Sequence, residues 1–335
     1  GRTRKRVLRI HADENLPEYK RAASLDDLDR AILEAHQEDV FCSYREVAEK
    51  RGVDISKLKG TIANNPLKDF YVSHQLGSSH LDLCTKTCGD IYEYCVRYVP
   101  KWTPTNITTS HAVYNISIPL EIGINFGIAL AEIEEQLRRG LDIDDVAPRM
   151  AFMCSNDMNI LEQVAKLRAI RRLWARLMKE RYGAKNPKSW TLRFGSETGT
   201  HTLYPQEPLN NIVRLTLEAL SLVLSGAQAM FVSGYDEPIA LPTEQSHHPS
   251  LRNQQIIAHE SGVANTADPL GGSYYIEWLT NKIENEANEL LATLESKGGI
   301  ASVEGAQWVR EQLDDSAWQH QQAIKNGSIV KVGVN

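Results

Sequence analysis

The residues best suited to chemistry in this sequence lie where short apolar runs end. Five such ends carry polar or small residues, among them a histidine, an arginine and carboxylates: 61–65, 110–111, 149–155, 195–200 and 233–237. The sequence lacks a Ser-His-Asp or Cys-His pattern, an HExxH motif, a P-loop and a GxGxxG motif. A site with few strong acids or bases suits a reaction whose difficult chemistry belongs to a cofactor.

Short apolar runs alternate with longer amphipathic segments from about residue 55 onward. The short runs lack strict alternation, which is typical of strands covered on both faces, and they predict strands at 60–64, 106–110, 150–154, 191–195 and 229–233. The longer segments repeat apolar residues near the 3.6-residue period and predict helices at 118–139, 159–182, 211–224 and 279–294. Strand–helix units in a row indicate a parallel sheet, whose carboxyl ends carry function in barrels.

These units predict an α/β protein with a (βα)8 TIM-barrel-like fold. Only five units are visible, and residues 1–50 do not supply three more, so the barrel could be incomplete at its N-terminal side. The predicted organisation is a divergent N-terminal segment (1–50), which is either partial barrel or a subunit contact, then the barrel units (51–305). A C-terminal helix and an extended tail complete it (306–335).

The composition excludes several classes of protein. A net charge of −6 over 335 residues gives no electrostatic footprint for nucleic acid or anionic membranes. Neither a signal peptide nor an apolar stretch of roughly 20 residues is visible, so we expect a cytoplasmic protein. Five scattered cysteines argue against a disulfide framework. Cys84, Cys88 and Cys95 could be weighed as zinc ligands, but buried thiols on one helix face are the better interpretation.

Several motifs occur in a fixed order along the chain. RFGSETG (193–199) precedes PLNNIVR (208–214), SGYDE (233–237), ALPT (240–243) and DPLGGSY (268–274). Upstream lie LKGTI (58–62), PKW (100–102), APR (147–149) and VAKLRA (164–169). Together these motifs resemble the methylmalonyl-CoA mutase family over residues 50–335.

The resemblance implies a radical isomerase of acyl-CoA substrates that uses adenosylcobalamin (coenzyme B12). In that family the cofactor lies between a (βα)8 barrel and a flavodoxin-like cobalamin domain. His111 corresponds to a histidine that hydrogen-bonds the acyl thioester carbonyl, and it is the predicted catalytic residue. Thr61 and Arg149 correspond to substrate contacts, and Glu237 to a glutamate that faces the cofactor.

Other positions depart from the family's pattern. At the substrate, Ser73 replaces an arginine that binds a carboxylate, and Ser110 replaces a tyrosine. Facing the cofactor, the replacements are Tyr114 for glutamate, Gly195 for histidine, Glu197 for glutamine and Ser233 for asparagine. Serine cannot bind a carboxylate through two parallel hydrogen bonds as arginine does. Because of Ser73, we therefore expect an acyl-CoA other than methylmalonyl-CoA, for example a branched or hydroxylated one.

The sequence contains no Asp-x-His-x-x-Gly motif, so a cobalt ligand is expected from another domain or subunit, and no metal ligand from this chain. The chain is therefore expected to be a fragment or to work with other polypeptides, as the acyl-CoA-binding large subunit of a hetero-oligomer with a separate cobalamin-binding subunit. An open half barrel would expose strand edges, which also favours association. The alternative hypothesis is a catalytically inactive paralogue that acts as a structural partner subunit. Membranes and nucleic acids are not expected partners.

Overall fold

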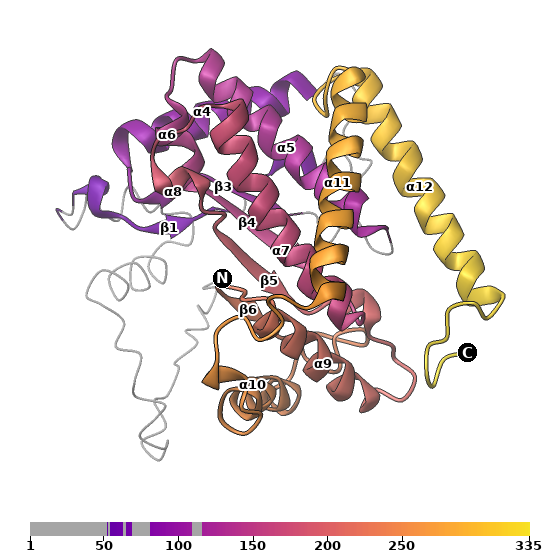
Figure 1. The fold of residues 1–335 in the computed structure, drawn as a ribbon. Helices are drawn as coiled ribbons and strands as arrows, with labels where there is room; N and C mark the ends of the chain where they lie inside the picture. Colours follow the sequence, from indigo (N-terminus) through magenta and orange to yellow (C-terminus); the bar gives the residue numbers. More distant parts are fainter. Residues whose placement is uncertain (1–51, 53, 63–64, 69–80, 109–115) are drawn as a thin grey trace, which may run out of the picture. The chain divides into compact units, whose positions relative to one another are not determined.

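The computed structural model describes residues 52, 54–62, 65–68, 81–108 and 116–335 (Figure 1). The chain divides into two compact units, 1–58 and 59–335. The described part of the first unit is a 3-10 turn, Ile55–Lys57, where the side chain of Asp54 accepts a hydrogen bond from the Ser56 N–H. Both sheets and all the α-helices described below belong to the second unit.

The described strands are all parallel and are arranged in chain order. β1 (Gly60–Thr61) pairs with β2 (Trp102–Thr103). A second sheet has the order β3 (Thr105–Thr108), β4 (Met150–Ser155), β5 (Phe194–Glu197) and β6 (Met230–Phe231). Only Pro104 separates β2 from β3, and since proline has no N–H to donate, it interrupts the ladder there.

All five predicted strands are confirmed in position, with shifted bounds. β5 begins at Phe194 rather than 191, because Pro187–Trp190 forms a short helix, α8, and Thr191 caps it. β2, which has only two residues, was not predicted from the sequence.

One face of the larger sheet packs on helices, and the other is partly open. Ile107, Phe152 and Phe194 are buried on the covered face, where the Phe152 ring meets the Trp174 ring edge-on at 5.2 Å. The alternate positions of the same strands are only half-buried, and they are small or flexible residues such as Asn106, Ala151, Met153 and Gly195. The sequence predicted that both faces of the sheet would be covered, and this holds for one face only.

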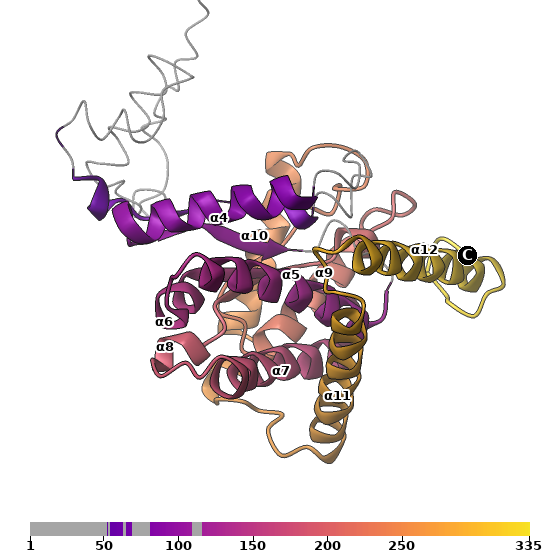
Figure 2. The same cartoon turned by 90° about the horizontal axis from the view of Figure 1, so that it is seen from above.

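Long helices pack around the larger sheet and on one another (Figures 1 and 2). The long helices are α4 (Leu81–Tyr98), α5 (Ile118–Arg138), α7 (Ile160–Arg176), α9 (Asn210–Leu224), α10 (Glu244–His259), α11 (Tyr274–Ser296) and α12 (Val303–Lys325). α11 packs against both α5 and α7, α4 packs on α5, and α10 on α9. The four helices predicted by residue range correspond to α5, α7, α9 and α11. α7 continues as a π-helical turn, Leu177–Arg181.

The predicted extended tail is wrong. Residues 326–328 and 332–334 form turns and bends, and the N–H of Ile329 bonds the carbonyl of Ala323. Gly327 at φ 76° ends α12 in the left-handed conformation that glycine favours, and the Asn335 side chain donates to the carbonyls of Ile324 and Ile329. The tail therefore folds back on the end of its own helix.

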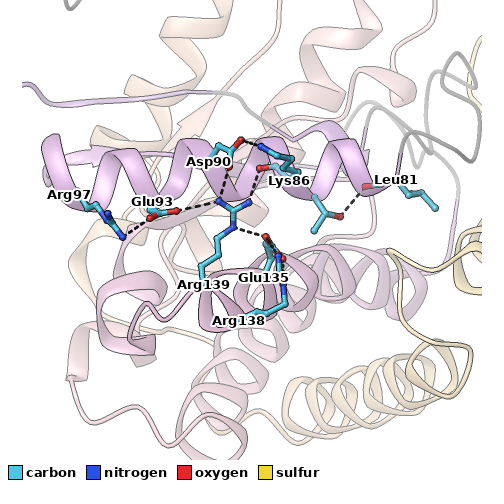
Figure 3. Close-up of polar contacts among 9 residues, drawn as sticks. Leu81, Lys86, Asp90, Glu93, Arg97, Glu135, Arg138 and Arg139 are labelled. Atoms are coloured by element: carbon cyan, nitrogen blue, oxygen red, sulfur yellow. Dashed lines mark hydrogen bonds and ion pairs between the residues drawn. The ribbon is translucent and has the colours of Figure 1, made fainter.

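Arg139 fastens α4 to the end of α5 (Figure 3). Its Nε donates to Glu135 at 2.6 Å, and its Nη1 lies 2.8 Å from Asp90 and 3.3 Å from Glu93. Only 15% of the side chain is exposed, so these charge-assisted bonds form in a partly desolvated setting. The neighbouring Arg138 also binds Glu135, but it is 72% exposed.

The α/β class and the parallel sheet are confirmed, whereas the described residues do not form a closed barrel. Within the described ranges, no strand pairs with the outer edge of β1 or of β6. No described helix has the length and apolar character needed to cross a bilayer.

Candidate functional site

The carboxyl ends of the strands come together at one edge of the sheet. In the register, Thr108 lies beside Met153, Ser155 beside Glu197, and Glu197 beside Phe231. The Nδ2 of Asn65, just after β1, lies 3.5 Å from the carbonyl of Thr108. Segments far apart in the sequence thus share one edge, as expected from the barrel-like order of strands.

A buried glutamate on α9 organises the loop after β5. The Oε2 of Glu218 accepts the Gly199 N–H at 2.7 Å, and its Oε1 lies 2.6 Å from the Thr202 hydroxyl. The side chain of Asn156, after β4, donates to the carbonyl of Glu218 at 2.9 Å. Burial raises the pKa of Glu218 to about 8, against the two hydrogen bonds, which lower it. Glu218 was not among the residues predicted from the sequence, although a charged residue on the apolar face of an amphipathic helix was the available signal.

A buried ion pair closes the end of β4. The Nζ of Lys166 (α7) lies 2.7 Å from Glu121 (α5) and donates to the carbonyl of Ser155 at 2.6 Å. The pair therefore fixes the first turn of α5 against the last residue of β4.

Asp157 and His201 form a second polar contact at this edge, 3.3 Å between Oδ2 and Nε2. Burial tends to raise the pKa of Asp157, but the hydrogen bond and charge of His201 outweigh it and lower the pKa to about 2. Asp157 is therefore a carboxylate throughout the physiological range.

A cavity of about 580 Å³ opens beside these groups, between α5, α7 and α11. Its lining includes Glu121, Asp157, Glu162, Glu286 and Glu289, with Lys166 as the counter-charge. Five carboxylates around one ammonium disfavour a phosphate-bearing ligand, so this cavity does not suit the nucleotide end of a coenzyme A ester.

The structure brings together three of the predicted cofactor-facing residues. Gly195 and Glu197 lie half-buried on the open face of β5. Ser233 follows the adjacent β6, where its N–H donates to the Thr198 hydroxyl at 3.1 Å and its carbonyl accepts from Ser250 at 2.6 Å. The neighbouring turn holds Glu237, half-buried.

The other predicted residues are distributed differently. Thr61 is the exposed last residue of β1. Ser73, Ser110, His111 and Tyr114 lie outside the described residues.

Arg149 lies at the amino end of β4, and its expected position at a carboxyl end is wrong. The strand begins at Met150, and residues Ala147–Arg149 form the 3-10 turn before it. The guanidinium contacts the carbonyl of Asp145 and lies 3.9 Å from its carboxylate. Arg149 therefore stands at the opposite end of the sheet from Glu197.

The cysteines of α4 are buried thiols, as predicted. Cys84, Cys88 and Cys95 are each less than 7% exposed, and they lie on the face of α4 that packs inward. Burial raises the pKa of Cys95, so it stays a thiol at neutral pH. Within the described part of the chain, no three His, Cys, Asp or Glu side chains gather as a metal site requires.

Comparison with known proteins identifies relatives. The family described as methylmalonyl-CoA mutase matches residues 31–335. The chain is 39% identical over 297 residues to the 2-hydroxyisobutanoyl-CoA mutase large subunit of Aquincola tertiaricarbonis, covering 88% of this chain and 53% of that protein. It is 36% identical to the mitochondrial methylmalonyl-CoA mutase of Homo sapiens, and 34% to the methylmalonyl-CoA mutase of Rhizobium meliloti (strain 1021); each match covers 88% of this chain. The chain spans 40% of the human protein and 41% of the Rhizobium meliloti protein. It therefore corresponds to about half of the length of these relatives or less.

Proposed function

Because this chain belongs to the methylmalonyl-CoA mutase family, we propose that it is the acyl-CoA-binding part of an adenosylcobalamin-dependent acyl-CoA mutase. The observation that carries the proposal is the meeting of Gly195, Glu197 and Ser233 at neighbouring strand ends. In the sequence, these three residues stand at the positions where the family resemblance implies contact with the cofactor.

The substrate is an acyl-CoA with a hydroxylated or branched acyl group and no free carboxylate at the usual position. Ser73 supports this, since it stands where the family's carboxylate-binding arginine is expected. The 39% identity to a protein named 2-hydroxyisobutanoyl-CoA mutase large subunit supports it independently.

Other parts of the machinery are supplied by other polypeptide segments. A (βα)8 barrel is completed by strands that pair with the outer edges of β1 and β6, which have no neighbour within the described ranges. A separate cobalamin-binding domain or subunit supplies the cobalt ligand, because this chain has no Asp-x-His-x-x-Gly motif.

The carboxyl edge of the sheet fits a large, hydroxyl-bearing cofactor. The Oδ1 of Asp236 is buried without a hydrogen-bond partner, and Glu197 and Glu237, which also lie in strand-end segments, are half-buried. Such acceptors would hold ribose hydroxyls, and Gly195 keeps the sheet face free of a bulky side chain. When bound, adenosylcobalamin supplies the organic radical that starts the rearrangement. His111 donates a hydrogen bond to the thioester carbonyl and stabilises charge that develops there.

Reconstitution tests the proposal. The chain in its full-length protein is combined with the cobalamin-binding partner, adenosylcobalamin and single acyl-CoAs, and isomers are separated by chromatography and mass spectrometry. We expect isomerisation of a 2- or 3-hydroxylated or branched acyl-CoA, and weak or no conversion of methylmalonyl-CoA. Preferred conversion of methylmalonyl-CoA would contradict the substrate assignment.

The second candidate function is an inactive structural subunit, which the departures at Ser110, Gly195 and Glu197 favour. It predicts that the complex assembles and binds the cofactor in its partner, but that no acyl-CoA in the panel is isomerised.

A further inference from the structure

The hydroxyl of Thr202 lies within hydrogen-bond distance of two acceptors. Its Oγ1 lies 2.7 Å from the carbonyl oxygen of Gly199 and 2.6 Å from Oε1 of Glu218. A hydroxyl carries one proton and can donate only one such bond. The Gly199 carbonyl has no proton to give and also accepts the Thr202 N–H at 3.2 Å, so both hydroxyl contacts are hydrogen bonds only if the carboxyl group supplies one of the protons.

Both groups are out of reach of water, because Glu218 is 0% exposed and Thr202 1%. The other carboxyl oxygen, Oε2, accepts the Gly199 N–H at 2.7 Å. All contacts are satisfied if Glu218 donates through Oε1 to Thr202 and Thr202 donates in turn to Gly199. An ionised Glu218 would leave two acceptors competing for one proton in a buried site.

We propose that Glu218 is a neutral carboxylic acid that positions loop 198–202 by donating a hydrogen bond to Thr202. It is a positioning residue, because it acts through the loop and does not touch the reacting groups. The consequence for catalysis rests on the proposed function, whereas the protonation state does not.

The loop links three strand ends. Thr198 accepts the Ser233 N–H, which ties the loop to β6. On the other side, a Cβ added to Gly199 would lie 2.3 Å from the Asn156 carbonyl oxygen, so the loop packs against the end of β4. Glu197 immediately precedes this loop, and its direction depends on the loop's conformation.

The charged and titratable groups around Glu218 come from four segments. Asp157 after β4 disfavours a second negative charge, and Lys331 in the C-terminal tail favours one. On α12, burial and the charges of Lys331 and of His201 in loop 198–202 lower the pKa of His320, whereas Asp157 raises it. Burial outweighs these effects and raises the pKa of Glu218 to about 8, in agreement with the hydrogen-bond count.

Stability measurements on the full protein test the protonation state. A carboxyl that ionises near its ordinary value of 4.5 when unfolded, but near 8 when folded, makes stability fall as pH rises between those values. Glu218→Gln preserves one donor and one acceptor without titrating. We expect the ratio of the unfolding constants, wild type over variant, to rise by up to about tenfold per pH unit between pH 5 and 8. A constant ratio across that range would overturn the proposal.

Infrared spectroscopy gives a second measurement that keeps Glu218 in place and does not require the Glu218→Gln variant to fold. Glu132 also has a pKa raised by burial to about 8, so Glu132→Gln is the background for the measurement. In glutamate-labelled Glu132→Gln protein at pH 6.5, we expect one protonated carboxyl stretch, which disappears above pH 9. Absence of that band at pH 6.5 would overturn the assignment.

The positioning role is tested in the assembled complex. We expect the wild-type affinity for adenosylcobalamin to weaken severalfold between pH 7 and 9, and that of Glu218→Gln to change by less than twofold. Equal pH dependence in both proteins would overturn the positioning role. A complex that never binds the cofactor would contradict the proposed function, while the stability ratio still decides whether Glu218 is protonated.

Discussion

Lys166 and Glu121 form a buried ion pair with 2.7 Å between Nζ and Oε2. The lysine side chain is 3% exposed and the glutamate 11%, and the same ammonium also bonds the carbonyl of Ser155. A buried charge is tolerated when it is paired in this way. Removing one partner leaves the other charge buried without a counter-charge. The pair holds α5 and α7 together at the edge of the sheet where the candidate site lies.

Lys166→Met should therefore destabilise the protein by about 3–5 kcal/mol, because Glu121 would remain buried without its partner. Urea denaturation measures the change. The double variant Lys166→Met/Glu121→Leu should recover most of the loss, since it removes both charges. A single variant as stable as wild type would contradict the role given to this pair.

Gly199→Ala should cost about 1–3 kcal/mol, because the new Cβ would lie 2.3 Å from the Asn156 carbonyl oxygen. The matched control is Gly195→Ala, whose Cβ would meet Met153 at an ordinary 3.5 Å. Thermal unfolding of the two variants checks the comparison. Equal melting temperatures would show that the loop can move away from Asn156 at little cost.

Glu132 on α5 predicts a pH dependence of stability. Burial raises its pKa to about 8, against hydrogen bonds to Thr105 and Cys88, which lower it. Because its folded pKa lies above the ordinary 4.5, its contribution is fully present below pH 4.5 and is lost as pH rises toward 8. Glu132→Gln should remove a slope of up to ~1.4 kcal/mol per pH unit in this window.

The control for this slope is Glu134→Gln, since Glu134 lies on the same helix with 55% of its side chain exposed. The control should leave the dependence of unfolding free energy on pH unchanged. If both variants keep the wild-type slope, Glu132 is ionised in the folded protein.

Arg138 and Arg139 bind the same glutamate but should differ in importance. Arg139→Gln should cost about 1–3 kcal/mol, because it removes the charge shared by Glu135, Asp90 and Glu93. Arg138→Gln should change stability by less than about 1 kcal/mol, since its ion pair is largely solvated. Chemical denaturation of both variants tests this order, and the reverse order would show that α4 is not held through Arg139.

His111→Ala should lower turnover by ~10²-fold or more in an active complex, because the thioester carbonyl would lose its hydrogen-bond donor. His247→Ala, an exposed position on α10, is the control. Undiminished turnover of the His111 variant, measured by product formation, would refute the catalytic role.

The apolar periodicity was sufficient to predict five strands and the helices α5, α7, α9 and α11, because those segments carry a short apolar run or a repeat near 3.6 residues. It could not predict β2, whose two residues carry no periodic signal, or the tail at 329–334, where side-chain bonds of Asn335 override an extended tendency. Gly195, Glu197 and Ser233 were found by the order of motifs, and their contiguity follows from parallel strands in register.

The sequence by itself determined the family, the α/β class and the identity of the residues at the strand ends, because these depend on local pattern and motif order. Tertiary structure alone decided that Lys166 and Glu121 pair at the end of β4 and that Glu218 lies against the loop that follows Glu197. A side chain's environment depends on which distant segments surround it. The burial that keeps Glu218 protonated comes from packing between α9 and three strand ends, so no stretch of sequence contains it.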